Sequence, residues 1–404
     1  MLLDFDHHAT TPLDPRVWEA MLPYLSDQYG NPSSLSHRRG LAAAAVELAA
    51  REQVARLLGV EANEVVWTSG ATESNNLALK GLLAGAMERR GLVTVATEHR
   101  SVLDPARRLG RAGHPLTVLP VDPCGQLDLD QLERAITPET ALVSVMWANN
   151  EVGTIAPIPE IAALCHQKGV WLHSDATQAV GKIPVNLRDI EIDLLSFSSH
   201  KLYGPPGIGA LVIRRTENRI PLVPQIEGGG QQGGVRSGTL PLALIVGFAK
   251  AMELCERERE ATAARLTVLR DRLWSELVAR LPGIVRHGDP SPSVAFFSEK
   301  GRSVAEQKAT LECVLPHNLN VGIPNIDGDA LLVRLQKSDL CVSSGAACSS
   351  TNREPSHVLT ALGIPERLAR ASLRFGLGKG TTGEEVTQAA MVLGEIVGEL
   401  QANE

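Results

Sequence analysis

A lysine that directly follows an apolar run is the first residue of this sequence whose position suggests chemistry. Lys201 comes after residues 196–200, which include Ser198 and His200, and before a turn at 203–207 that contains two prolines. A lysine that is removed from water loses its proton more easily and can form a Schiff base. Because a lone lysine in a loop is usually a surface residue, this interpretation needs partners elsewhere in the chain.

A carboxylate at the end of another apolar run is such a partner. Residues 170–174 predict a strand that ends at Asp175, and Gln178 follows three residues later, on the same face of an expected short helix. A carboxylate in this position could keep a pyridinium nitrogen protonated, which makes the ring an electron sink. The alternative is an ordinary helix-capping aspartate.

Small residues that follow a third apolar run predict a phosphate site. Residues 69–75, which include Ala71 and Thr72, come after an expected strand and open an expected helix. Backbone N–H groups at the start of a helix suit an anion, and Thr72 adds a hydroxyl. The alternative is a helix that is capped by Ser69 or Thr72.

A cysteine in a run of small polar residues is the fourth candidate. Cys348 lies within 343–351, where no side chain is large enough to anchor a core. A cysteine on such a loop can be exposed and reactive, whereas the usual alternative is a buried, inert thiol.

Two other features of the sequence do not match the nucleotide-binding and metal-binding sites that they suggest. The glycine run at 228–234 has the context of neither a dinucleotide loop nor a P-loop, and His7 and His8 have no third ligand spaced for a metal.

The elements that would position these residues alternate along the chain. Apolar runs at 64–68, 92–97, 116–121, 142–147, 170–174 and 193–198 predict strands, and helical patterns separate most of them, as at 72–90. This alternation predicts an α/β fold with a mostly parallel sheet covered by helices, in which ligands collect beyond the carboxyl ends of the strands. Long helices are expected over 240–280. A smaller α+β domain is expected after them, with an aperiodic stretch at 288–315.

The length and composition of the chain indicate its number of domains, its partners and its location. A chain of 404 residues predicts two domains, which we place at 15–255 and at 1–14 with 256–404, the smaller one carrying the cysteine loop at about 343–353. The net charge of -7 gives no general reason to bind nucleic acid directly, and no apolar run is long enough to span a membrane. Six scattered cysteines and an N-terminus without the pattern of a signal peptide predict a reducing, cytoplasmic location.

Taken together, these segments resemble the cysteine desulfurases, the NifS/IscS-like branch of the class V aminotransferase-type enzymes that use pyridoxal 5′-phosphate in fold-type I. The loop at 343–348, with Glu354-Pro355-Ser356 after it, is similar to the long-loop branch of that family. Further matching motifs are Asp14-Pro15-Arg16, Gly30-Asn31-Pro32-Ser33-Ser34, Thr97-Glu98-His99, Asn149-Asn150-Glu151-Val152-Gly153, Arg236-Ser237-Gly238-Thr239-Leu240-Pro241 and Arg374-Phe375-Gly376-Leu377-Gly378.

The resemblance implies a role for each candidate residue. Lys201 would hold the cofactor covalently, His99 would stack on its ring and relay protons, and Cys348 would be the nucleophile. Asn150 and Arg374 would bind the substrate carboxylate, a natural use of the guanidinium fork. The implied cofactor-binding residues are Ala71, Thr72, Asp175, Gln178, Ser198, His200, Lys201 and, from the other subunit of a homodimer, Thr239.

The implied reaction converts L-cysteine to L-alanine and leaves the sulfur on Cys348 as a persulfide. An acceptor protein, either an iron–sulfur scaffold or a relay for thio-cofactor or tRNA synthesis, would then take the sulfur. We expect the loop that carries Cys348 to be mobile and the 288–315 segment to be a partner or lid element, because long aperiodic loops are usually functional or disordered. The alternatives are a selenocysteine lyase or another class V enzyme, and a scaffold without catalytic activity.

Overall fold

The computed structural model describes residues 2–215, 220–288, 313–344 and 354–402. Cys348 and most of the 288–315 segment lie outside these residues. The expectations about the cysteine loop and about the 288–315 segment therefore remain predictions. Among the described residues, no helix has the length and apolar character needed to cross a membrane.

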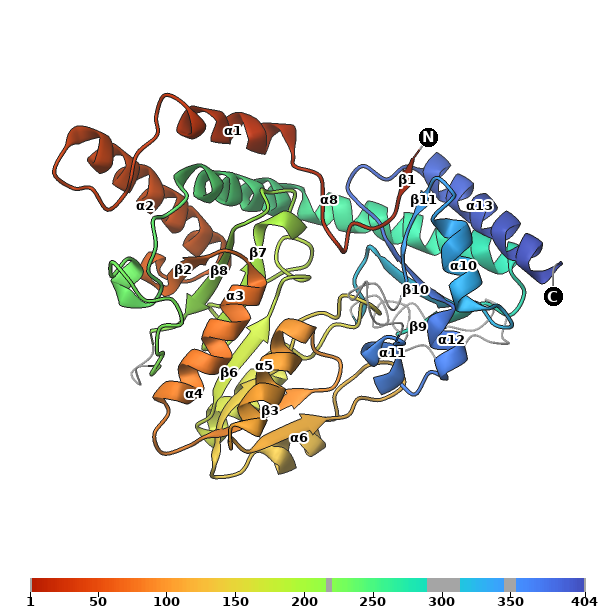
Figure 1. Ribbon diagram of the computed structural model, residues 1–404, viewed down its shortest axis with the longest axis horizontal. Helices are drawn as coiled ribbons and strands as arrows, with labels where there is room; N and C mark the ends of the chain where they lie inside the picture. The colour runs from red at the N-terminus through yellow and green to blue at the C-terminus, as the bar shows by residue number, and fades with distance from the viewer. Residues whose placement is uncertain (1, 216–219, 289–312, 345–353, 403–404) are drawn as a thin grey trace.

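A seven-stranded sheet forms the centre of the larger part of the molecule (Figure 1). Only β8 runs against its neighbours, β2 and β7, so the sheet is mostly parallel, and the predicted α/β class is confirmed. The strands, in their order across the sheet, are β2 (Val65–Thr68), β8 (Gly209–Ile213), β7 (Leu194–Ser198), β6 (Trp171–Asp175), β5 (Thr140–Ser144), β3 (Gly91–Val95) and β4 (Leu116–Leu119). Every residue of β3, β5 and β7 is buried, as expected for strands that helices cover on both faces.

Helices cover both faces of this sheet and form an apolar core with it on each face. They are α1 (Pro15–Leu25), α2 (Arg38–Leu58), η1 (Ala62–Glu64), α3 (Ala71–Asn76), η2 (Leu77–Gly81), α4 (Leu82–Gly85), α5 (Arg100–Arg111), α6 (Leu129–Ala135), α7 (Ile158–Lys168), η3 (Ser199–Lys201) and η4 (Gln232–Gly234). The helix expected over 72–90 is shorter than predicted. It passes through a π-helical turn at η2 and ends at Gly85, because Ala86 leaves it in an extended conformation.

A smaller α+β part lies beside the large one (Figure 1). Its sheet has the order β12 (Ser343–Ser344), β13 (Ser372–Gly376), β10 (Asn318–Gly322) and β9 (Val285–His287), and the N-terminal β1 (Leu3–Asp4) pairs separately with β11 (Leu340–Cys341). Its helices are α10 (Gly328–Leu335), α11 (His357–Ala361), α12 (Glu366–Arg370) and α13 (Gly383–Gln401).

One long helix, α8 (Leu242–Arg280), joins the two parts. Its first half, to Leu254, packs into one core of the large sheet, whereas Leu266, Leu273 and Leu277 belong to the separate core of the smaller part, with β10 and β13. The division of the chain into 15–255 and 1–14 with 256–404 stays a prediction, which these two cores support.

The side chain of Gln232 covers the outer edge of β2. The backbone N–H of Trp67 donates to Gln232 Oε1 at 2.6 Å, and Gln232 Nε2 donates to the carbonyl of Trp67 at 2.8 Å. The guanidinium of Arg51 donates to the carbonyl of Val65 on the same edge. The glycine run at 228–234 therefore carries a side chain that pairs with the end strand of the sheet.

Candidate active site

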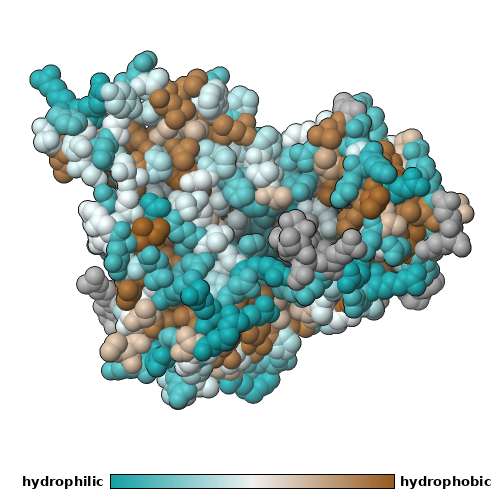
Figure 2. All heavy atoms as spheres, in the orientation of Figure 1, coloured by the Kyte–Doolittle hydropathy of each residue, from teal (hydrophilic) through white to brown (hydrophobic). Residues whose placement is uncertain are grey.

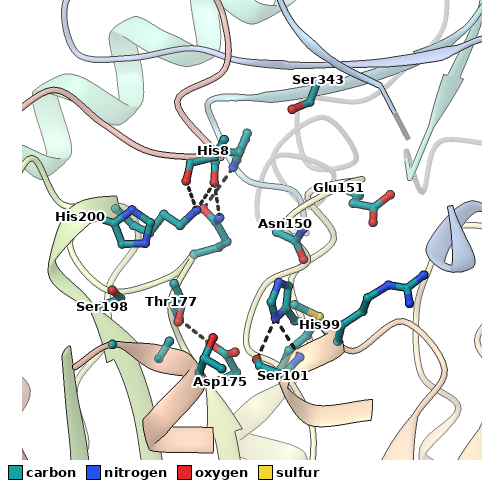
Figure 3. A pocket seen from close by; sticks show the side chains of 18 of the residues that line it. His8, His99, Ser101, Asn150, Glu151, Asp175, Thr177, Ser198, His200 and Ser343 are labelled. Atoms are coloured by element: carbon teal, nitrogen blue, oxygen red, sulfur yellow. Dashed lines mark hydrogen bonds between the residues drawn. The ribbon is translucent and has the colours of Figure 1, made fainter. Parts of the chain in front are cut away.

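A cavity of about 680 Å³ lies where the carboxyl ends of the strands of the large sheet meet the smaller part of the molecule. Figure 2 shows the hollowed region between the two parts, and Figure 3 shows the side chains that point into it. The N-terminal segment closes one side, because Asp6, His8 and Ala9 line the cavity together with residues from the sheet.

The cavity brings together most of the predicted site residues. Those that line it are Ala71, Thr72, His99, Asn150, Asp175, Gln178, Ser198, His200, Lys201 and Arg374. Thr239 does not line it and is exposed. Its expected contact with a partner subunit stays a prediction.

Lys201 ends η3, the short helix that directly follows β7. Its Nζ lies 2.5 Å from the carbonyl oxygens of both His8 and Ala9, so the N-terminal segment holds the amine at the cavity wall. The strand that precedes Lys201 is fully buried and fixes the position of its backbone.

Asp175 is the last residue of β6, and hydrogen bonds hold both of its carboxylate oxygens. The backbone N–H of Thr177 donates to Oδ1 at 3.0 Å, and Asn75 Nδ2 donates to Oδ2 at 2.7 Å. Asp175 is 5% exposed and lies at the floor of the cavity (Figure 3). Asn75 belongs to the 69–75 segment, but no sequence pattern indicates its contact with Asp175.

His99 is oriented by the first turn of α5, where Ser101 lies. The backbone N–H of Ser101 donates to His99 Nδ1 at 3.1 Å, so Nδ1 is an acceptor and the neutral ring carries its hydrogen on Nε2. Burial lowers the pKa of His99, and the nearby Asp175 opposes this effect. His99 is therefore neutral near pH 7.

The loop at 69–71 lies against the sheet in a way that only glycine allows. Gly70 has φ +155°, and a Cβ on Gly209 of β8 would come within 2.6 Å of the Gly70 Cα. Gly70 begins α3 without a side-chain cap, so the alternative of a cap from Ser69 or Thr72 is wrong. The Thr72 side chain instead lines the cavity, together with the first turn of the helix.

Gln178 lies on consecutive turns rather than on the short helix that the spacing predicted. The turns run over 177–182 and include Gly181, whose φ of +72° does not continue a right-handed helix. Lys182 Nζ donates to Gln178 Oε1 at 2.5 Å, and His8 Nδ1 lies 3.1 Å from the same oxygen. Sequence reasoning missed both contacts.

Arg374 projects from β13 and is 8% exposed. Its Nη2 donates to Asp6 Oδ1 and to Ser343 Oγ, both at 2.9 Å, and its Nη1 donates to the carbonyl of Asn150 at 2.9 Å. Its Nε has no hydrogen-bond partner among the described residues. The guanidinium is thus fixed at the cavity and retains an unused donor.

Glu98, the neighbour of His99 in the sequence, is a fully buried acid that does not itself line the cavity. Burial raises the pKa of Glu98 well above its usual value, and the charge of Asp175 acts in the same direction. The backbone N–H of Met146 donates to Oε1 of Glu98, which ties the segment before Asn149 and Asn150 to the turn that carries His99. Glu98 was present in the Thr97-Glu98-His99 motif, but no role was assigned to it.

The residues at the cavity fit pyridoxal 5′-phosphate, the cofactor that the resemblance implies. Hydroxyl and imidazole donors gather at the Gly70 loop, Asp175 offers a carboxylate to a ring nitrogen, and Lys201 offers an amine to an aldehyde. The buried Thr177 Oγ1 lines the same cavity without a hydrogen-bond partner among the described residues, so it is available to a ligand. The chain depends on this cofactor.

Comparisons with known proteins agree with this geometry. The model of the family described as aminotransferase class-V matches residues 4–388. The cysteine desulfurase IscS of Anaeromyxobacter dehalogenans (strain 2CP-C) is 46% identical over 398 residues, which cover 98% of this chain and 92% of the relative. The cysteine desulfurase of Mus musculus is 46% identical over 389 residues, covering 96% and 80% of the two chains.

Among solved structures, a NifS-like protein superimposes with a TM-score of 0.87 at 37% identity and covers 99% of this chain and 100% of its own. Sequence and structure thus point to the same group of proteins over nearly the whole chain. The chain belongs to the aminotransferase class-V family and, within it, to the cysteine desulfurases.

Proposed function

We propose that this cysteine desulfurase binds pyridoxal 5′-phosphate and L-cysteine in the cavity between its two parts and passes the sulfur to Cys348. The observation that carries the proposal is that Lys201, Asp175 and His99, which are far apart in the sequence, line one cavity. An amine, a carboxylate and a neutral imidazole are the groups that this cofactor chemistry requires.

The phosphate end of the cofactor would be held at the Gly70 loop. Ala71 and Thr72 lie in the first turn after Gly70, and Ser198 and His200 come from the end of β7. Burial lowers the pKa of His200 to about 4, with the charge of Lys201 acting in the same direction. In the ligand-free chain His200 therefore offers a neutral N–H rather than a charge.

The ring end would be held by Asp175 and Gln178. When bound, pyridoxal phosphate serves as an electron sink that stabilises the electron pair left at the substrate Cα after loss of its proton. Asp175 supports this role because its carboxylate is fixed by Asn75 and Thr177 and can accept a hydrogen from a ring nitrogen. Lys201 would hold the cofactor, and the Nε2–H of His99 can donate a hydrogen bond within the same cavity.

The substrate carboxylate would be held by Arg374 and Asn150. Arg374 is anchored by Asp6, Ser343 and the backbone of Asn150, and its Nε remains available. A buried guanidinium that is held in place forms strong, well-oriented hydrogen bonds to a carboxylate. This contact would orient the substrate so that its sulfur faces the residue that accepts it.

The sulfur transfer itself is assigned to Cys348. The Cys348 thiolate attacks the sulfur of L-cysteine, and the carbon–sulfur bond breaks as the sulfur–sulfur bond forms, which leaves the electron pair of the broken bond on the carbon side. Alanine leaves after its Cβ takes up a proton and its Cα regains the proton that it lost. Cys348 and the neighbouring residues 345–353 lie outside the described residues, so this role rests on the sequence. Its support from the structure is that Ser344 and Glu354, which flank the undescribed stretch, both line the cavity.

We also propose a homodimer, in which Thr239 of one subunit would reach the phosphate of the other. The exposure of Thr239 and its absence from the cavity of its own chain support this idea. A sulfur-acceptor protein, for iron–sulfur cluster, thio-cofactor or tRNA synthesis, and a cytoplasmic location complete the proposal. No direct contact with nucleic acid is expected at a net charge of -7.

The test is the balance of products. The purified chain, loaded with pyridoxal phosphate and given L-cysteine with a thiol reductant, should release alanine and sulfide in equal amounts. Cys348→Ala should keep the visible spectrum of the bound cofactor but release no sulfide, and Cys124→Ala is the matched control. Selenocysteine supplied as the competing substrate tests the lyase alternative. Equal sulfide release by the wild type and by Cys348→Ala would contradict the proposed sulfur acceptor.

A further inference from the structure

Two residues outside the predicted site contact the same atom of Gln178. Lys182 Nζ lies 2.5 Å from Gln178 Oε1, and His8 Nδ1 lies 3.1 Å from it. His8 is 1% exposed and Gln178 is 4% exposed, so water does not compete for these bonds. No pattern in the sequence indicates a contact of His8 or Lys182 with Gln178.

The contact with Lys182 settles which way the Gln178 amide faces. An amide can be turned by 180° to exchange its oxygen and its nitrogen, but a protonated lysine has only donors. The atom that faces Lys182 must therefore be the oxygen, and Nε2 must face the other way. Gln178 Nε2 donates one hydrogen to the carbonyl of His8 at 3.2 Å, which leaves its second hydrogen for a ligand in the cavity.

The same logic fixes the ring of His8. Because Gln178 Oε1 accepts, His8 Nδ1 must carry the hydrogen and donate it. Burial, with the nearby His317 and Arg374, lowers the pKa of His8 well below its usual value, so its Nε2 is an acceptor. Asn318 Nδ2 lies 3.1 Å from this Nε2 and supplies the matching donor.

The surroundings keep His8 neutral and in place. Its ring stacks on His317 with centroids 4.6 Å apart. The positive charges of Arg374 and Lys182 face it, and Lys201 Nζ donates to its carbonyl oxygen at 2.5 Å. Protonation of His8 would place a positive charge beside these cations, and no water would screen their repulsion. One residue thus supports both Gln178 and Lys201.

We propose that Lys182 and His8 are positioning residues that hold the Gln178 amide in one orientation, so that Gln178 donates a hydrogen bond to an oxygen anion of the cofactor ring. This inference rests on the proposed binding of pyridoxal 5′-phosphate in the cavity. A fixed donor favours the deprotonated form of a ring hydroxyl, whereas a turned amide would present its oxygen and favour the protonated form.

Lys182 also borders a second, small cavity of about 50 Å³ that is lined by His7, Cys255 and Lys379. Burial lowers the pKa of Lys182 to about 7, and the charge of Lys201 acts in the same direction. The orientation of Gln178 does not depend on this titration, because the carbonyl of His8 can only accept and therefore faces the Nε2 donor in either form of Lys182. Only removal of the amine, or of the His8 N–H, should release the amide.

The first test needs no cofactor. In the apoprotein labelled with 15N at histidine, the His8 signal is assigned by its absence in His8→Asn. At pH 7 the ring should be neutral with its hydrogen on Nδ1. A hydrogen on Nε2, or a charged ring, would overturn the inference whatever the fate of the proposed function.

The second test compares variants. Lys182→Met and His8→Leu each remove one donor to Gln178 Oε1, and His8→Asn keeps a donor near the position of Nδ1. His7→Asn is the matched control, since His7 has no bond to Gln178. The measurements are the Kd of the apoprotein for pyridoxal phosphate and the pH midpoint of the visible band of the bound cofactor.

Lys182→Met and His8→Leu should each raise the Kd about tenfold, because a charged group loses one oriented hydrogen bond. The midpoint should rise by about one pH unit in both, because the ring oxygen holds a proton more tightly without its donor. His8→Asn and His7→Asn should resemble the wild type. A rise only in Lys182→Met would reflect loss of charge alone and would overturn the inference, as would unchanged values in both variants.

Failure of this inference is distinguishable from failure of the proposed function. The Lys201→Ala variant tests whether the cofactor binds through Lys201. The protonation state of the His8 ring is measured in the apoprotein and does not depend on that result. If Lys182→Met does not fold, the comparison of His8→Leu with His8→Asn and the spectrum of the labelled wild-type protein still decide the outcome.

Discussion

Asn75 joins Asp175 to Ser101 through a single amide. Its Nδ2 lies 2.7 Å from Asp175 Oδ2 and 2.8 Å from Ser101 Oγ. Ser101 Oγ is in turn 2.7 Å from His99 Nδ1, so a continuous chain of hydrogen bonds connects the floor of the cavity with its histidine wall. Asn75 is fully buried, and no other described side chain donates to the Asp175 carboxylate.

Replacing Asn75 should therefore impair catalysis more than folding. Asn75→Leu preserves the approximate shape but removes the donor to Asp175 and to Ser101. We expect kcat/KM for L-cysteine to fall by about tenfold to a hundredfold, the equivalent of one charge-assisted hydrogen bond. Steady-state alanine production measures the fall, and a thermal unfolding scan controls for stability. Wild-type kcat/KM in a folded variant would show that Asp175 needs no support from Asn75.

Lys201→Ala should abolish the covalent attachment of the cofactor. The amine that borders the cavity is removed, while the residues expected to hold the phosphate and the ring remain. The visible absorption band of the bound cofactor should change, the cofactor should be lost on dialysis, and alanine release should stop. Lys80→Ala, on the helical turn η2, is the control. Normal turnover by Lys201→Ala would refute the assignment.

Arg374→Lys should weaken the binding of substrate rather than of cofactor. A lysine keeps the charge but cannot contact Asp6, Asn150 and a carboxylate at once, because it lacks the planar fork. We expect KM for L-cysteine to rise by about tenfold or more, with the cofactor spectrum unchanged. Initial rates over a range of L-cysteine concentrations measure this change. If KM stays constant and kcat alone falls, Arg374 does not bind the substrate carboxylate.

His287 should make the protein less stable in acid. Burial lowers the pKa of His287 to about 4, below the usual value near 6.5, so the unfolded chain binds more protons than the folded chain between these values. The contribution of His287 is constant above about pH 6.5, becomes unfavourable as the pH falls toward 4, and is constant again below it. The expected loss by pH 4.5 is on the order of 2 kcal/mol.

This loss is measured as a difference between proteins. His287→Gln removes the titrating group, and urea unfolding of both proteins at pH 7 and pH 4.5 gives the change in the free energy of unfolding. The half-buried His114→Gln provides the background. If the wild type and His287→Gln lose the same free energy between the two pH values, His287 does not titrate as its burial requires.

The predictable part of the site is the part that lies at strand ends. Asp175 is the last residue of a strand of the large sheet, and Lys201 and Thr72 follow two other strands. The ends of parallel strands meet at one edge, so the types and positions of these residues were sufficient to bring them together. The mostly parallel sheet itself followed from the alternation of apolar and helical patterns.

The contacts that were not predictable join distant parts of the chain. His8 reaches Gln178 across 170 residues because β1 pairs with β11 and leads the N-terminal segment over the cavity, a pairing between two-residue strands that no local pattern indicates. Gln178 was placed on a helix because the spacing from Asp175 allowed one, whereas Gly181 turns the chain away. Asn75 lay within a noted segment, but the direction of a buried side chain depends on packing.

The pairing of Gln232 with Trp67 has a consequence for how copies of this chain can associate. The end strand of an open sheet is a template on which a strand of another molecule can add, and such addition leads to aggregation. In β2 the outward-facing groups of Trp67 are already bonded to one amide side chain, and the carbonyl of Val65 is bonded to Arg51. The glycine-rich stretch therefore protects this edge from edge-to-edge growth, and copies of the chain cannot associate by a sheet that continues across β2 at Trp67.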